Sequence, residues 1–427
     1  MTASGQRSGR ATAVGVVAAA WLLTSVFYFY QYSMRSAPAV MVPELSSAFG
    51  MSAVGIASLV GLFYWAYAPF SLVAGVAMDQ VGPKAVVPIG AASVAIGAML
   101  FSTGDPTLGS IGRFMQGAGG VFALIGAVYL VSTYMPASRA ATLVGATQMF
   151  GMAGGSAGQF VVGPLIGSGV PWNMFWLAMG IAGLPIAVLL FILIPGRGAA
   201  TTKKPDLRAA LGGFGAVFKN PQSILCGLIA GLIFIPTTIF DMVWGVRFLQ
   251  EAHALPYEVA VLRSAAVPFG WIIGCPLLGW VSDRIGRRKP VIVGASAVLL
   301  VTLSLALYGP PGLLPPFTLA LVAGIASGAA MLPYTVIKEA NRPEHGGTAT
   351  GVINFVNFSL TAMFGPLFAS RLMKISQGAE TRELADYQAT FMPMIFGVGL
   401  AVLLTLLLRE TGPKARGRSA IPTLVTN

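Results

Sequence analysis

The chain has 427 residues, of which 56% are hydrophobic and only 9% are charged. Soluble domains carry roughly 25% charged residues, so the composition excludes a soluble protein and indicates one embedded in a bilayer. The 2 Cys and 2 His are not clustered, which excludes a disulfide scaffold or a Cys/His metal centre as the organising feature. We therefore expect no cofactor and no metal. The net charge of +12 resides in short loops between apolar segments, so it indicates membrane topology and not a nucleic-acid partner.

Apolar stretches predict twelve membrane-spanning helices in two sets of six, because one span needs about 20 apolar residues. The first set is expected at 13–37, 52–78, 84–103, 107–134, 140–166 and 173–195. The second set is expected at 222–248, 259–281, 289–308, 315–338, 347–374 and 388–409. Strand-like alternation is absent, so the predicted fold is an all-α integral membrane bundle.

The distribution of positive charge predicts the orientation. With the N-terminus in the cytoplasm, most of the 26 Lys and Arg fall on the cytoplasmic side, which predicts an N-in, C-in topology. The expected parts are an N-terminal half (1–196), a cytoplasmic linker (197–221) with a short helix over 206–219, a C-terminal half (222–412) and a tail (413–427). An Ala/Gly-rich composition favours a bacterial inner membrane, with a eukaryotic organelle as the alternative, and we expect a monomer.

A spaced Gly-Asp-Gly motif occurs twice, 204 residues apart. The first copy has Gly75, Asp79, Gly82 and Lys84, and the second has Gly279, Asp283, Gly286, Arg287 and Arg288. A second echo pairs Thr142 with Thr348, 206 residues apart. Internal repeats of this kind are typical of transporters built from two related halves, which bind substrate where the halves meet.

The motif resembles the loop between the second and third helices of the major facilitator superfamily, Gly-x3-Asp-Arg-x-Gly-Arg-Arg, and the resemblance covers nearly the whole chain. The second copy matches almost fully, whereas the first has Gln80 and Pro83 at positions that are usually basic. The resemblance implies a transporter with these residues as a conformational gate. The alternative is that the basic residues only orient the loop.

Two further segments resemble elements of that superfamily. Arg113-Phe-Met-Gln116-Gly117-Ala-Gly119 is similar to a fourth-helix pattern that the family associates with proton coupling, so Arg113 and Gln116 are candidate coupling residues. The alternative for Arg113 is an arginine that extends to the membrane interface. The fifth span matches the glycine pattern of exchangers only partly, so it does not support antiport.

Arg35 is the strongest candidate for substrate binding. It shares a helical face with Tyr28, Gln31 and Tyr32. A guanidinium group suits bidentate capture of a carboxylate or phosphate, and phenols add hydrogen bonds or apolar walls. An arginine extending to the interface above an aromatic belt is the alternative. The interval to Pro43 resembles the first helix of organophosphate exchangers in this superfamily, where an arginine at this spacing binds phosphate.

The seventh span lacks the second arginine that those exchangers have there, which argues against a phosphate substrate. It offers Asp241 instead, which could bind the amine of a zwitterionic substrate, carry a proton, or pair structurally with Arg247 or Arg263. Uncharged candidates for the wall of the substrate cavity are Gln148, Trp244, Tyr334, Asn354 and Asn357. The alternative for Asn354 and Asn357 is interhelical hydrogen bonding.

These residues predict a secondary active transporter that works by alternating access, coupled to protons, for a small carboxylate-bearing solute such as an organic anion, amino acid or short peptide. No ATP-binding Gly-x4-Gly-Lys loop and no catalytic constellation occur, so we expect neither an ATPase nor another enzyme. The alternatives are efflux of drugs or metabolites, sugar-phosphate exchange, or a membrane sensor that does not transport.

Overall fold

The computed structural model describes residues 3–51, 53–196, 207–310, 316–377 and 382–414. Within these ranges the chain is helical and contains no strand. Eleven described helical segments are long and apolar enough to cross a membrane, and α1 (Ala3–Ser36) covers the expected first span. The predicted all-α membrane fold is therefore confirmed. Residues 197–206 of the expected linker and 415–427 of the expected tail lie outside the described ranges.

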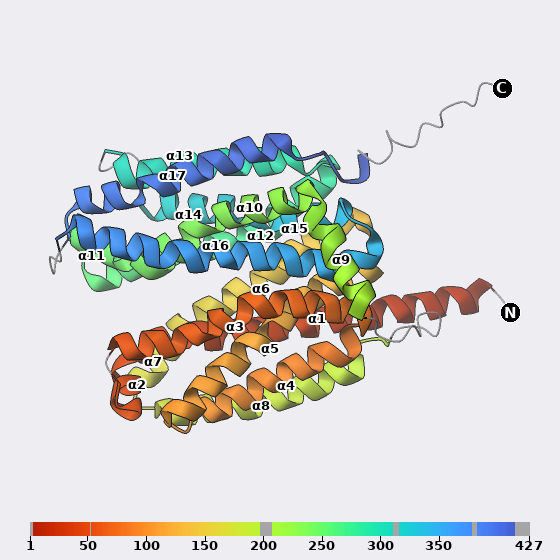
Figure 1. The fold of residues 1–427 in the computed structure, drawn as a ribbon, viewed down its shortest axis with the longest axis horizontal. Helices are drawn as coiled ribbons and strands as arrows, with labels where there is room; N and C mark the ends of the chain where they lie inside the picture. The colour runs from red at the N-terminus through yellow and green to blue at the C-terminus, as the bar shows by residue number, and fades with distance from the viewer. Residues whose placement is uncertain (1–2, 52, 197–206, 311–315, 378–381, 415–427) are drawn as a thin grey trace. The chain divides into compact units, whose positions relative to one another are not determined.

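The first of two compact units comprises Met1–Tyr134, Phe150–Val217 and Glu344–Phe355. Its helices after α1 are α2 (Val42–Phe49), α3 (Ala53–Gln80), α4 (Pro83–Phe101), α5 (Pro106–Tyr134), the second half of α6 (Ala140–Phe160), whose first half belongs to the other unit, α7 (Val162–Gly167), α8 (Trp172–Leu193), most of α9 (Leu207–Lys219) and the start of α16 (Gly346–Ile375). Within the unit α4 packs against α5 and α8, and α3 packs against α5 (Figure 1). Helix α9 confirms the short helix predicted after the sixth span.

The second unit comprises Met135–Met149, Phe218–Pro343 and Val356–Asn427. Its helices are α10 (Pro221–Ile235), the π-helix η4 (Pro236–Gly245), α11 (Val246–His253), α12 (Tyr257–Ile285), α13 (Lys289–Tyr308), α14 (Pro316–Ser327), α15 (Leu332–Glu339) and α17 (Leu384–Leu407), with the rest of α16. Short 3₁₀ turns complete the path of the chain. The turn η1 (Ala37–Val40) follows α1, and η2 (Ala137–Arg139) precedes α6. The turn η5 (Gly328–Met331) joins α14 to α15, and η6 (Pro343–His345) precedes α16. Within this unit α12 packs against α14, and α13 against α17.

The repeated glycines end their helices for the same physical reason. Gly82 follows α3 with φ of 92°, and Gly286 follows α12 with φ of 72°. Residues with a Cβ rarely adopt this left-handed backbone, so glycine is the residue that allows both turns. Their ψ angles differ, 164° at Gly82 before α4 and 21° at Gly286 after α12, so the two positions share the requirement for a positive φ but not one conformation.

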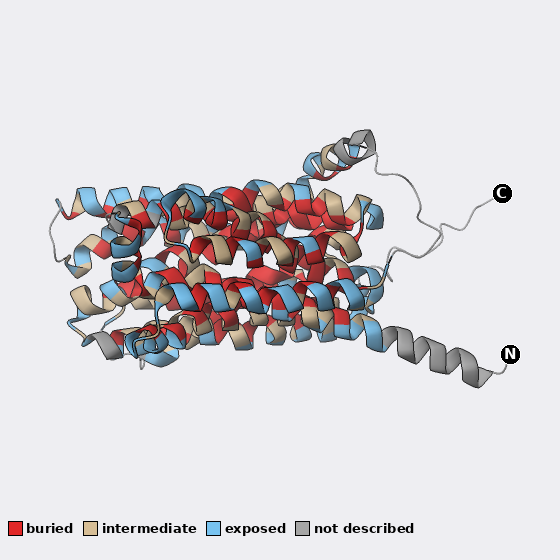
Figure 2. Cartoon of the chain, turned by 90° about the horizontal axis from the view of Figure 1, so that it is seen from below, coloured by how far each residue is buried: buried red, intermediate tan, exposed pale blue. Residues whose placement is uncertain are grey.

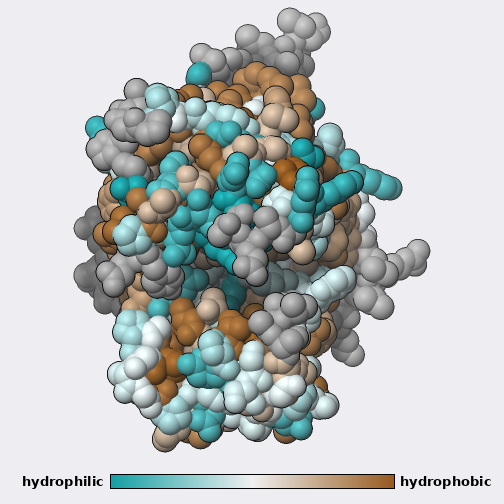
Figure 3. All heavy atoms as spheres, turned by 90° about the vertical axis from the view of Figure 1, so that its left-hand side faces the viewer, coloured by the Kyte–Doolittle hydropathy of each residue, from teal (hydrophilic) through white to brown (hydrophobic). Residues whose placement is uncertain are grey.

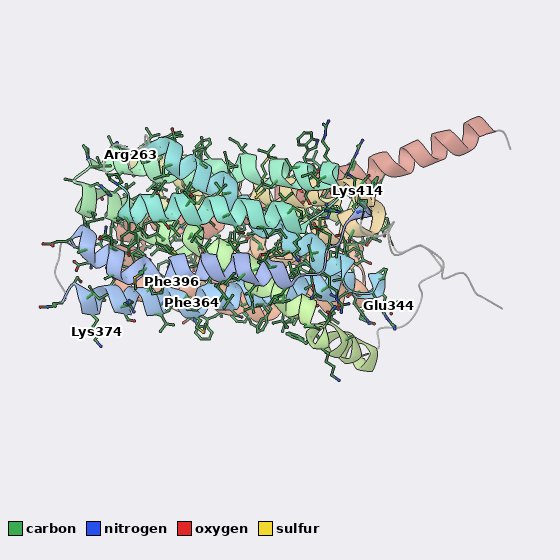
Figure 4. All side chains as sticks on the ribbon, turned by 90° about the horizontal axis from the view of Figure 1, so that it is seen from above. Arg263, Glu344, Phe364, Lys374, Phe396 and Lys414 are labelled. Atoms are coloured by element: carbon green, nitrogen blue, oxygen red, sulfur yellow. The ribbon has the colours of Figure 1, made fainter. Side chains whose placement is uncertain are left out.

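Large apolar side chains face outward, as expected for helices that contact lipid. Trp65 is 79% exposed and Phe396 is 67% exposed. Single helices are buried along one side and exposed along the other in Figure 2. In the second unit Phe396 lies between the two ends of the helices (Figure 4). Arg263 and Lys374 lie at one end, and Lys414 lies at the other. Hydrophilic residues gather on the end face that Figure 3 shows.

The expected seventh span is not a continuous α-helix. Helix α10 ends at Ile235, and the π-helix η4 occupies the next ten residues. Pro236 has no N–H group to donate to the carbonyl four residues earlier, so the α-helical hydrogen-bond pattern is interrupted there. A π-helix of this kind often marks a functional position, and it contains Asp241.

Candidate functional site

Arg35 lies in the last turn of α1 among aromatic rings from two helices. Its guanidinium carbon is 4.6 Å from the ring centre of Tyr32 and 4.7 Å from that of Tyr64 on α3. Its Nε atom donates a hydrogen bond to the Tyr64 hydroxyl at 3.1 Å. The side chain is half-buried, and Tyr64 is 36% exposed. The rings therefore fix the guanidinium in place without closing it off.

The predicted tyrosine face of α1 is present in the first unit. The ring centres of Tyr28 and Tyr32 are 4.8 Å apart, and both side chains are buried. Helix α3 adds Phe63 and Tyr67, whose ring centres are 5.7 and 5.8 Å from the Arg35 guanidinium carbon. The sequence analysis missed this contribution from α3. The three- and four-residue spacing of these aromatic residues and Tyr64 in the second span was the available clue.

Arg113 is fully buried in α5 and does not extend to the membrane interface. Its Nη1 atom donates to Gln116 Oε1 at 2.6 Å and to the Met34 carbonyl at 3.2 Å. A continuing helix would offer that carbonyl the N–H of residue 38, but Pro38 has none. Arg113 thus satisfies a carbonyl of α1 immediately before Arg35. Aromatic rings surround the guanidinium, namely those of Phe63, Phe101 and Trp176.

Asp241 lies in the π-helix of the second unit and is 9% exposed. Its Oδ1 atom accepts a hydrogen bond from the Ser264 hydroxyl of α12 at 3.0 Å. None of the ion pairs found among the described residues includes Asp241. Arg247, one of the two counter-ions considered from the sequence, lies 3.6 Å from Glu251 instead. The carboxyl is therefore held by a hydroxyl group in an otherwise apolar helix.

In the first unit Asp79, a predicted gate residue, caps the start of α16. Its carboxylate accepts hydrogen bonds from the backbone N–H groups of Gly347 at 2.7 Å and Thr348 at 2.6 Å, and from the Thr348 hydroxyl. Gly75 lies so close to Gly347 that a side chain at position 75 would meet its carbonyl. Lys84 donates to carbonyls at the end of α8, those of Phe191 and Ile194.

The second unit repeats this arrangement with an added ion pair. Asp283 accepts from the backbone N–H and hydroxyl of Thr142 at 2.9 and 2.7 Å, and Gly279 packs on the same segment of α6. Arg288, 1% exposed, pairs with Asp283 and with Glu339. Burial lowers the pKa of Arg288, but the hydrogen bonds and charges of Glu339 and Asp283 outweigh that effect and raise it. The two repeated patterns of the sequence are therefore in contact, because Asp79 binds Thr348 and Asp283 binds Thr142.

The uncharged candidates have contacts that fall in both units. Asn354 donates to Ser71 Oγ at 2.8 Å in the first unit, whereas Asn357 donates to the Tyr334 hydroxyl at 3.2 Å in the second. Gln148 is 2% exposed on α6. Trp244 lies with its ring centre 5.8 Å from the Arg382 guanidinium carbon. The asparagines therefore make interhelical hydrogen bonds, which the sequence analysis had kept as their alternative role.

Comparison with known proteins defines the class. The fold matches that of the fucose:proton symporter FucP of E. coli, with a TM-score of 0.70 at 16% identity over 93% of this chain and 100% of that one. It also matches the proton:xylose symporter XylE, with a TM-score of 0.72 at 15% identity over 94% and 97% of the two chains. The fold is thus that of multi-pass membrane transporters.

The sequence gives the family. The Major Facilitator Superfamily profile matches residues 21–366, so the chain belongs to that superfamily, which is a family of transporters and not of enzymes. It is 22% identical to the membrane sensor protein UhpC of Salmonella typhimurium, over 90% of this chain and 89% of that protein. It is 27% identical to the cephamycin export protein CmcT of Amycolatopsis lactamdurans, over 57% of this chain and 49% of that protein.

Proposed function

We propose that this transporter carries a small carboxylate-bearing solute by alternating access, with the Arg35 guanidinium as the ligand of the carboxylate. The aromatic setting of Arg35 supports this assignment. The rings of Tyr32 and Tyr64 hold a permanent cation in a partly accessible position. A planar guanidinium can bind both oxygens of a carboxylate, and the surrounding phenols provide further donors.

A thermal-shift screen of the purified protein tests this function. Organic anions, amino acids, dipeptides and sugar phosphates are compared, because a ligand that binds the folded state raises its apparent stability. We expect carboxylates to stabilise the wild-type protein and to have no effect on the Arg35→Ala variant. Stabilisation by sugar phosphates alone would indicate exchange of phosphorylated metabolites, and stabilisation only by lipophilic compounds would indicate efflux. A carboxylate that binds but is not transported would indicate a sensor.

We propose Asp241 as the proton carrier that couples transport to a gradient. Its carboxyl lies in the π-helix of a membrane-spanning segment, held by Ser264, which is the setting in which an ionisable group usually has a functional role. The FucP and XylE structures are both of proton symporters, which supports proton coupling as the driving force. Bacterial relatives support a bacterial inner membrane as the location.

The Asp241→Asn variant is expected to lose gradient-driven accumulation and to retain exchange of internal for external solute. The amide keeps an acceptor for Ser264 but cannot release a proton. Uptake into proteoliposomes with an imposed proton gradient, compared with counterflow without a gradient, measures both activities. The Ser264→Ala variant is the matched control and should accumulate solute. Loss of both activities by a folded Asp241→Asn protein would instead assign Asp241 to substrate binding or structure.

A further inference from the structure

The geometry points to a second anion-binding position in the first unit, formed by Arg113, Gln116 and Gln31, and hence to a substrate with two carboxylate groups. This inference rests on the proposed function, because it takes Arg35 as the ligand of the first carboxylate. It assigns Arg113 to substrate binding in place of the coupling role implied by its motif.

The three side chains contain an excess of unused hydrogen-bond donors. Arg113 is 0% exposed, and Gln116 and Gln31 are each 1% exposed. Arg113 Nε and Nη2, Gln116 Nε2 and Gln31 Nε2 have no hydrogen-bond partner among the residues that the structure describes, and the only unused acceptor of these three side chains is Gln31 Oε1. A buried donor without a partner costs about 1–3 kcal/mol. A group of such donors therefore favours a ligand that accepts hydrogen bonds.

These atoms lie along one line of contact between α1 and α5, which we call the α1–α5 seam. Gln31 faces Gly120 so closely that a Cβ atom at position 120 would lie 2.9 Å from Gln31 Oε1. Gln116 precedes Gly120 by one helical turn, and Arg113 precedes Gln116 by another. Arg113 also contacts α1, because it donates a hydrogen bond to the Met34 carbonyl. The donors therefore lie along the same helix–helix contact, Gln31 on α1 and Arg113 and Gln116 on α5.

The charge of the seam is not balanced by an acidic side chain of the described residues. None of their ion pairs includes Arg113. Arg113 Nη1 donates hydrogen bonds to the Met34 carbonyl and to Gln116, and aromatic rings contact the guanidinium group. These contacts leave Nε and Nη2 without an acceptor among the described residues. A buried cation in a membrane protein is costly unless a partner compensates it. An anionic group of the substrate would supply that partner.

The Phe63 ring, which both guanidinium groups contact, gives an upper limit on the distance between the two positions. Its ring centre is 5.7 Å from the Arg35 guanidinium carbon and 5.3 Å from that of Arg113, so these two carbons are at most 11.0 Å apart. An extended four-carbon dicarboxylate, with charge-assisted hydrogen bonds of about 2.8 Å at each end, reaches guanidinium carbons roughly 12 Å apart. One short dicarboxylate can therefore engage both arginines.

Matched pairs of acids test the inference with the purified full-length protein. Succinate is compared with butyrate, glutarate with pentanoate and adipate with hexanoate, since each pair has the same chain and differs by one carboxylate. We expect at least one dicarboxylate to bind about 10- to 100-fold more tightly than its partner, the ratio that a hydrogen bond to a charged group provides. In Arg113→Gln this ratio should fall close to one.

Other outcomes separate this inference from the proposed function. Equal affinities within every pair, or a preference that survives Arg113→Gln, would overturn the second position and leave Arg35 as the carboxylate ligand. Absence of binding by every acid would overturn both. Glycerol phosphate bound more tightly than any dicarboxylate would show that one doubly charged group is recognised. Gln31→Leu removes a seam donor without breaking a protein hydrogen bond, so it should lower dicarboxylate affinity even if Arg113→Gln fails to fold.

Discussion

Replacing Arg35 with lysine is expected to lower carboxylate affinity about 10- to 100-fold, which corresponds to the loss of a strong hydrogen bond to a charged group. Lysine keeps the positive charge but not the planar fork of donors. It also loses the stacking of a flat guanidinium between Tyr32 and Tyr64, whose ring centres lie 4.6 and 4.7 Å away. Isothermal titration with the best carboxylate of the screen measures the change directly.

The matched control is Arg263→Lys. Arg263 lies at one end of the second unit (Figure 4), so the same chemical change is made in the unit that does not contain the proposed carboxylate ligand. Its affinity should equal that of the wild type, and both variants should unfold near the wild-type temperature. Wild-type affinity in Arg35→Lys would show that charge alone suffices at this position, or that the substrate binds elsewhere.

The sequence predicted the membrane fold and the pairs of repeated residues because both depend on local patterns. Apolar runs of spanning length define the helices, and the spacing of Asp79 and Asp283 marks equivalent turns. The partner of each repeated Asp could not be read from the spacing. Only the folded chain brings Asp79 to Thr348 and Asp283 to Thr142.

The part of the candidate site on α1 could be predicted from the sequence, but the contacts that other helices make with it could not. Helical periodicity places Tyr32 beside Arg35, and the structure has them in contact. The contribution of Tyr64 depends on how α3 packs against α1, which no local pattern encodes. The π-helix around Asp241 was also missed, because Pro236 predicts a break in the hydrogen-bond pattern but not how the chain resumes.

The Asp283→Asn variant is expected to destabilise the protein more than Asp79→Asn, although the two residues are sequence equivalents. Both changes weaken the hydrogen bonds that the carboxylate accepts from the start of another helix, α16 for Asp79 and α6 for Asp283, at a cost of about 1.5–3 kcal/mol. Asp283→Asn also breaks one ion pair of Arg288, whose side chain is only 1% exposed. Removing one partner of a buried ion pair costs about 3–5 kcal/mol when the other charge is left unpaired, and because Arg288 keeps Glu339 the added cost should lie below that range. The apparent unfolding temperature in detergent measures the difference.

Hydrogen exchange at the capped amides shows whether these contacts act as a gate. Asp283→Asn should speed exchange at Thr142, and Asp79→Asn should speed exchange at Thr348, because each amide loses a charged acceptor. Thr142→Val keeps the backbone hydrogen bond to Asp283 and the Arg288 ion pair, so its exchange rate and unfolding temperature should lie between those of Asp283→Asn and the wild type. If Asp79→Asn lowers the unfolding temperature as much as Asp283→Asn does, the Arg288 ion pair adds no stability. The gate would then depend on the helix caps, which both halves share.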